Sequence, residues 1–139
     1  MGELSLILYI EDEPAVRQVV KRILERTASF HLVTCRSGFE AFQILSICSF
    51  DLILLDIMMP GLDGFTTLKI LRSSDRFANT PIIFLTAGVL PYEVASYMPL
   101  GVLGTIPKPF EANKLAQTIQ ELWEDWRFKA CSIGERSRP

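Results

Sequence analysis

Charged and polar side chains stand at the ends of several apolar segments of this chain, where they could act together. They are Glu11, Asp12, Asp56, Thr86 and Lys108. If the segments are parallel strands of one sheet, these side chains meet at its carboxyl edge, where open α/β sheets bind ligands. Three carboxylates close together disfavour each other's ionisation unless a cation compensates them. Mg²⁺ fits this role because it binds one or two carboxylates together with waters and a phosphate.

A metal held by carboxylates points in turn to phosphate chemistry. A phosphoryl group that passes to a carboxylate needs its oxygens neutralised, and a divalent cation and an ammonium group do this together. Asp56 is the candidate nucleophile, because carboxylates form covalent phosphoryl intermediates. Lys108 would supply the ammonium group, and Thr86 would donate its hydroxyl to a phosphoryl oxygen.

The segments that must position these residues alternate between two patterns, which predicts the element order βαβαβαβαβα. Near-continuous apolar strands are typical of a parallel sheet with both faces covered by helices. We expect strands at residues 4–10, 31–35, 52–56, 81–86 and 104–107. We expect helices at residues 14–25, 38–47, 65–72 and 91–98, and a last one from about 111. One stripe of that last helix carries Leu115, Ile119, Leu122 and Trp126.

Length and charge exclude other classes. The 139 residues suffice for one domain, which we expect at residues 4–127, with a polar C-terminal tail or linker start at 128–139. We expect this tail to be frayed unless it begins a linker to another domain. The net charge of −2 gives no general attraction to nucleic acid or anionic membranes. No signal peptide and no apolar run of roughly 18 residues is seen, so we expect no membrane contact.

The three cysteines do not form a metal-binding pattern. Cys35, Cys48 and Cys131 are widely spaced, no CxxC pair exists, and His31 is the only histidine. A thiolate–imidazole metal site is therefore not expected. We expect reduced thiols, two of them buried, and a cytoplasmic location.

Four segments of the chain together resemble the receiver family of two-component response regulators, over about residues 4–127. Each lies at the end of an expected strand. They are residues 9–14 (YIEDEP), 54–64 (LLDIMMPGLDG), 85–87 (LTA) and 106–110 (IPKPF). The resemblance implies a flavodoxin-like (βα)5 fold, with a five-stranded parallel sheet in the order 2-1-3-4-5 and helices on both faces.

The resemblance also implies a role for each site residue. Asp56 would be the phospho-acceptor, Lys108 would bind the phosphoryl group, and Thr86 would be the switch hydroxyl. Mg²⁺, or Mn²⁺ in its place, would bind the Asp12 and Asp56 carboxylates. The remaining metal contacts would come from the backbone carbonyl of Met58 and, through a water, from Glu11. The Lys108–Pro109 peptide would be cis.

The partner implied is a histidine kinase or a histidine phosphotransfer protein. His31 stands at the start of a strand, so the donor histidine must belong to that partner. The chain would then be no enzyme beyond its own phosphorylation and dephosphorylation. The basic stripe of Arg17, Lys21 and Arg22 is either a solvated helix face or a kinase contact. Output would go to a downstream protein or a homodimer, through the face formed by the fourth helix, fifth strand and last helix.

Three positions depart from the family pattern. Thr105 stands where an aromatic residue commonly moves inward on activation, so transmission through that output face needs smaller side-chain movements. Met58 and Gly88 stand two residues after Asp56 and Thr86, and neither side chain can orient an attacking water. We therefore expect slow self-dephosphorylation.

Two other site types fit the sequence poorly. A haloacid-dehalogenase-type phosphatase needs a second aspartate two residues after the nucleophile, where this chain has Met58. A flavodoxin-like cofactor site needs a small, polar phosphate loop after the first strand, and the acidic residues 11–13 would repel a phosphate. A receiver that docks a partner without phosphorylation remains open because of Thr105.

Overall fold

The computed structural model describes residues 3–27, 30–88 and 91–137. Five strands pair in parallel in the order β2-β1-β3-β4-β5. They are β1 (Leu6–Ile10), β2 (His31–Cys35), β3 (Leu52–Asp56), β4 (Ile82–Thr86) and β5 (Val102–Pro107). The predicted fold class and strand order are confirmed, and β5 lies at an edge, where the prolines around it are tolerated.

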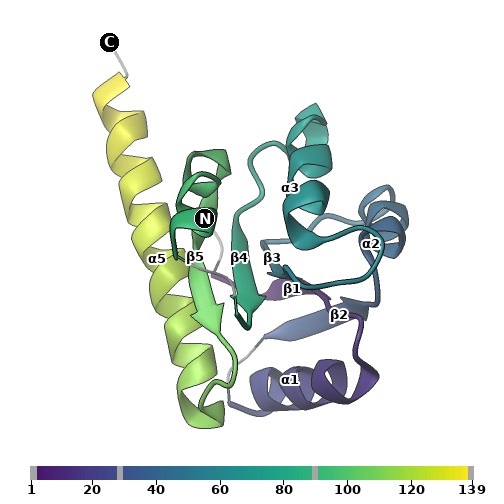
Figure 1. The fold of residues 1–139 in the computed structure, drawn as a ribbon. Helices are drawn as coiled ribbons and strands as arrows, with labels where there is room; N and C mark the ends of the chain where they lie inside the picture. Colours follow the sequence, from purple (N-terminus) through teal and green to yellow (C-terminus); the bar gives the residue numbers. More distant parts are fainter. Residues whose placement is uncertain (1–2, 28–29, 89–90, 138–139) are drawn as a thin grey trace.

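Helices cover both faces of this sheet (Figure 1). They are α1 (Pro14–Thr27), α2 (Gly38–Leu45), α3 (Gly64–Arg72), α4 (Pro91–Ala95) and α5 (Ala112–Ser137), with short 3₁₀ turns η1 (Asp75–Phe77) and η2 (Met98–Leu100). Buried residues of α1 and α5 pack on one face, and those of α2, α3 and α4 pack on the other. The sheet is therefore enclosed, as its continuous apolar strands predict.

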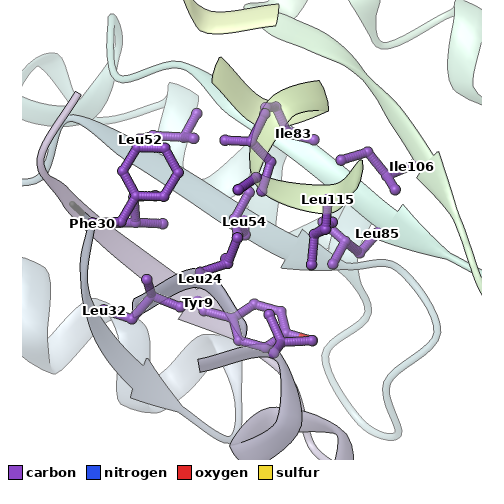
Figure 2. Packing of buried hydrophobic residues seen from close by; sticks show 14 of the residues in the cluster. Tyr9, Leu24, Phe30, Leu32, Leu52, Leu54, Ile83, Leu85, Ile106 and Leu115 are labelled. Carbon is purple, nitrogen blue, oxygen red and sulfur yellow. The ribbon is translucent and has the colours of Figure 1, made fainter. Parts of the chain in front are cut away.

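Alternation along each strand divides the core into two clusters. In β3, Leu52 and Leu54 belong to the cluster under α1 and α5, while Ile53 and Leu55 belong to the opposite one. Figure 2 shows the first cluster, in which Tyr9 from β1 lies among side chains of neighbouring elements. Burying one such aliphatic side chain contributes about 1.5–3 kcal/mol. The two clusters together hold the strand ends in a fixed relation.

Several element boundaries differ from the prediction. Helix α4 ends at Ala95 rather than residue 98, because Pro99 interrupts helical hydrogen bonding and the chain continues as η2. Strand β5 begins earlier, at Val102, and α5 continues to Ser137. The expectation of a frayed tail was therefore wrong up to residue 137, because adding a turn to an existing helix is favourable even without an apolar stripe. The domain boundary at residue 127 stays a prediction.

Two further expectations concern the state of the thiols and the lack of membrane-spanning segments. Cys35 is buried and Cys48 is exposed, both as free thiols, and the Cys131 side chain lies outside the described residues. Burial raises the pKa of Cys35 to about 12. In the described part of the chain, every helix is either too short or too polar to cross a membrane.

One arginine joins three segments at the end of the sheet away from the strand carboxyl ends. Arg72, the last residue of α3, donates from Nε to the Leu100 carbonyl at 2.5 Å and from Nη1 to the Phe77 carbonyl at 2.6 Å. Its Nη2 donates to the Thr80 carbonyl at 2.5 Å. The guanidinium group thereby fastens α3 to the segments that precede β4 and β5.

We expect Arg72→Ala to lower the free energy of unfolding by about 3 kcal/mol, since bonds from charged donors each contribute about 1.5–3 kcal/mol and partly overlap here. Urea unfolding measures the change. Arg76→Ala is the matched control, because exposed Arg76 makes one side-chain bond to the described backbone, to the Ser46 carbonyl at 2.8 Å. Equal losses in the two variants would contradict a special role for Arg72.

Candidate functional site

The ends of β1 and β3 bring three carboxylates together. Ile10 pairs with Leu55 in the parallel register of these strands, so the residues that follow, Glu11 and Asp56, lie side by side. Glu11, Asp12 and Asp56 each offer a carboxylate oxygen within 4.8 Å of the others. The cluster has the hard oxygen atoms and the spacing that a divalent cation requires.

Lys108 reaches this cluster from the end of β5. Its Nζ lies 2.5 Å from Glu11 Oε1 and 3.7 Å from Asp56 Oδ2. The Lys108 backbone N–H donates to the Thr86 carbonyl at 2.8 Å, which continues the β4–β5 pairing past the strand end. The Lys108–Pro109 peptide is cis, as the family resemblance implied. The ammonium group is thus held between two of the three carboxylates.

Burial makes the charges of this site costly. Asp56 is 3% exposed, and burial together with the neighbouring Glu11 raises its pKa to about 7, although Lys108 opposes this. Burial and Glu11 also raise the pKa of Asp12. Burial is also the largest single influence on Glu11 and acts upward, but the hydrogen bonds with Lys108 and Asp56 and the charge of Lys108 together outweigh it and leave that pKa lowered. One ammonium group therefore does not compensate three acids, and the cluster favours a bound cation.

The loop after β3 packs closely against Asp56. Met58 donates its backbone N–H to Asp56 Oδ1 at 3.2 Å. At Gly64, the first residue of α3, a Cβ atom would lie 2.6 Å from both the Asp56 carbonyl oxygen and the Ile57 Cα. Glycine is required there because only a residue without a side chain allows α3 to start so close to the acceptor strand.

This arrangement of strand ends agrees with a comparison to known families. Residues 7–120 match the family model of the response regulator receiver domain. The chain belongs to the response regulator receiver family. Receiver domains are signalling proteins rather than conventional enzymes, and those of response regulators interact with histidine kinases and phosphotransfer proteins.

Individual relatives agree with this assignment. The chain is 32% identical over 116 residues to the probable transcriptional regulator ycf29 of Porphyra purpurea, covering 84% of this chain and 55% of ycf29. It is 27% identical over 118 residues to the chemotaxis protein CheY of Pseudomonas aeruginosa, covering 85% of this chain and 95% of CheY. The solved chemotaxis response regulator CheY4 of Vibrio cholerae superposes with a TM-score of 0.77 at 28% identity, over 86% of this chain and 98% of CheY4. The receiver spans about half the length of ycf29 and of two further regulators that it matches.

The remaining predicted positions lie around the acceptor. Thr86 is buried, and its hydroxyl makes a long contact of 3.5 Å with the Ala87 carbonyl and no other bond to the residues that the structure describes. The Met58 side chain is 62% exposed, and Gly88 has a positive φ of 75°. Thr105 is half-buried on β5. No polar side chain therefore stands at positions 58 and 88 of this receiver to bind a water.

Three contacts of Glu11 were not predicted from the sequence. The Tyr9 hydroxyl donates to Glu11 Oε1 at 3.1 Å, the Glu13 N–H to Oε2 at 3.4 Å, and Arg17 Nη1 to the Glu11 carbonyl at 2.8 Å. Arg17 is thus tied to the site rather than to solvent alone. The two-residue alternation of a strand, which places Tyr9 and Glu11 on one face, was the available signal.

Proposed function

We propose that Asp56 of this receiver accepts a phosphoryl group from a histidine kinase or a histidine phosphotransfer protein in a Mg²⁺-dependent reaction. The observation that carries the proposal is the Lys108 ammonium group between Glu11 and Asp56, beside a cluster of three carboxylates. A nucleophilic carboxylate, a cation site and a fixed ammonium group are the parts that phosphoryl transfer needs.

The acidic cluster fits a divalent cation, since it holds three buried or half-buried carboxylates, and Lys108, which pairs with Glu11 and Asp56, is the one ammonium group recorded close to it among the described residues. Asp12 and Asp56 would hold Mg²⁺, or Mn²⁺ in its place, through their carboxylates. Met58 would contribute its backbone carbonyl, and Glu11 would act through a water. The metal, when bound, neutralises phosphoryl oxygens and lowers the repulsion between the incoming phosphate and the carboxylates.

The chain's own residues would do the remaining work. An Asp56 oxygen attacks phosphorus, the phosphorus–nitrogen bond of the donor phosphohistidine breaks, and its electron pair stays on the imidazole. The Lys108 Nζ lies 3.7 Å from Asp56 and needs only a short movement to reach the transferred group. Thr86, whose hydroxyl makes a long contact of 3.5 Å with the Ala87 carbonyl, would turn to donate to a phosphoryl oxygen.

The output of this reaction is also part of the proposal. The phosphorylated domain would act in the cytoplasm and change its α4–β5–α5 face, to bind a downstream protein or a second copy. Thr105 fills the usual aromatic position of β5, so the change on that face would be small. Methionine at 58 and glycine at 88 cannot orient water, so the aspartyl phosphate would hydrolyse slowly.

Mass spectrometry after incubation with Mg²⁺ and acetyl phosphate tests the proposal. We expect the mass of one added phosphoryl group, none when EDTA removes the metal, and a lifetime of minutes or longer once the donor is removed. Decay within seconds would contradict the expectation for Met58 and Gly88. No uptake with Mg²⁺ would overturn the proposal and favour a receiver that docks its partner unphosphorylated, which the missing aromatic at Thr105 otherwise supports.

A further inference from the structure

A tyrosine lies directly beneath the acidic cluster. Tyr9 lies on β1 and Glu11 follows the end of this strand two residues later, so both side chains point to the sheet face that α1 and α5 cover. The ring is 0% exposed and packs in the core cluster seen in Figure 2. Its hydroxyl lies at the acidic cluster and donates to Glu11 Oε1 at 3.1 Å. The other side chains of β1 are apolar, so the Tyr9 hydroxyl is the polar side-chain group of this strand, and it contacts the site.

The Glu11 oxygen that receives this bond is shared with Lys108. Glu11 is 1% exposed, and among the described residues Oε1 accepts from the Tyr9 hydroxyl and from Lys108 Nζ, the latter at 2.5 Å. The other oxygen, Oε2, accepts the long bond of 3.4 Å from the Glu13 N–H, and the Asp12 and Asp56 carboxyl groups are the other side chains that interact with Glu11. For a buried carboxylate, the loss of its last hydrogen-bond donor costs far more free energy than the loss of one of two donors.

We propose that Tyr9 is a positioning residue whose hydroxyl compensates Glu11 while Lys108 leaves it to bind the phosphoryl group on Asp56. This inference rests on the proposed function. When Nζ moves toward Asp56, Oε1 loses its ammonium donor and keeps the Tyr9 hydroxyl. The phenol hydroxyl is the donor in this contact, because an ionised carboxylate oxygen only accepts. Tyr9 therefore favours the state in which Lys108 is bound to phosphate.

Tyr9→Phe tests this, because it removes the hydroxyl and keeps the ring in the core. The probe is beryllofluoride, which mimics a phosphoryl group on a carboxylate, titrated by ¹⁹F NMR at saturating Mg²⁺. We expect the beryllofluoride dissociation constant of Tyr9→Phe to rise on the order of ten-fold, as for loss of a hydrogen bond to a charged group. The Mg²⁺ dissociation constant, measured alone by calorimetry, should change little, since Lys108 then still compensates Glu11. Tyr92→Phe on α4, where the ring is 71% exposed, is the matched control and should match wild type in both titrations.

The outcomes separate three cases. No beryllofluoride binding and no phosphorylation by the wild-type protein would overturn the proposed function itself. Wild-type binding with an unchanged constant in Tyr9→Phe would overturn only the role of Tyr9. An equal rise of the Mg²⁺ and beryllofluoride constants would also overturn it, because the hydroxyl would then act on the acidic cluster as a whole.

A double-mutant cycle guards against a purely structural effect of the lost hydroxyl. Glu11→Gln removes the buried charge that Tyr9 is proposed to compensate. In that background Tyr9→Phe should change the beryllofluoride constant by less than about two-fold, because the coupling between contacting residues is lost. A further ten-fold rise in the Glu11→Gln background would overturn the proposal, since the hydroxyl would then act without the charge of Glu11.

Discussion

Asp56→Asn is expected to take up no phosphoryl group from acetyl phosphate, at any Mg²⁺ concentration. The amide keeps the size of the side chain, but it has no carboxylate oxygen to attack phosphorus. Asp56 stands at the end of β3 with Oδ1 bound to the Met58 N–H and Oδ2 facing Lys108. Mass spectrometry of the intact protein measures the effect as complete loss of the added phosphoryl mass.

Controls separate this loss from misfolding and from unspecific labelling. Asp75→Asn changes an exposed aspartate of η1 outside the site and should be labelled like wild type. A labelled Asp56→Asn protein would show that another residue is the acceptor.

The stability of Asp56→Asn should not fall. Burial raises the pKa of Asp56 from its ordinary 3.8 to about 7, so the folded state binds this proton more tightly than the unfolded chain does. Without metal, wild-type stability therefore decreases as pH rises from the lower value to the higher, where the buried carboxylate becomes charged. Asparagine at position 56 does not ionise, so the variant lacks this decrease of stability with pH. Thermal unfolding at pH 8 should give the variant a midpoint equal to or above that of wild type.

Lys108→Met is expected to reduce the rate of phosphorylation on the order of 10²–10³-fold, as for removal of one donor to a developing anion. Methionine keeps most of the unbranched stem and removes the only ammonium group recorded within 4 Å of Asp56 among the described residues. Initial rates with acetyl phosphate at saturating Mg²⁺ measure the effect. Lys114→Met is the matched control, because that lysine is exposed and its ion pair in the described part of the chain is with Glu111, three residues away.

The pH dependence of the Lys108→Met phosphorylation rate distinguishes two roles of Lys108. Lys108 lowers the pKa of Asp56 against burial and Glu11, so its removal leaves more of Asp56 protonated at neutral pH. If this were its only effect, the Lys108→Met rate would return to the wild-type value at pH 9. We expect the rate to stay low at pH 9, because the phosphoryl oxygens also lose their cation. Full recovery at pH 9 would contradict the proposed phosphoryl contact.

Much of this fold follows from local sequence pattern. Strand β3 is continuous in apolar residues up to Asp56, and only a strand covered on both faces reads in this way. The strand ends could be located for the same reason, so Asp56, Thr86 and Lys108 could be assigned to one edge of the sheet. The order of the strands, however, came from the resemblance to receivers, because periodicity does not tell which strands are neighbours.

Helix faces were predicted less well than strands. The expected stripe of α5 is confirmed, since Leu115 and Ile119 are buried and Leu122 and Trp126 pack half-buried against the same cluster, but it left out Trp123, which the structure also buries. Both tryptophans are compatible with helical spacing, and the angle at which α5 crosses the sheet decides between them. That angle depends on packing against the neighbouring β5 and against α1, which is distant in the sequence.

The sequence by itself determined the residue types of the site and the edge of the sheet where they gather, because apolar runs and their polar ends are local features. Only the tertiary structure decided how these side chains share their bonds. Lys108 is closer to Glu11 than to Asp56, and the Tyr9 hydroxyl meets the same Glu11 oxygen. The contact between Lys108 and Glu11 joins residues 97 positions apart, and such a contact depends on the twist and spacing of the four strands from β1 to β5.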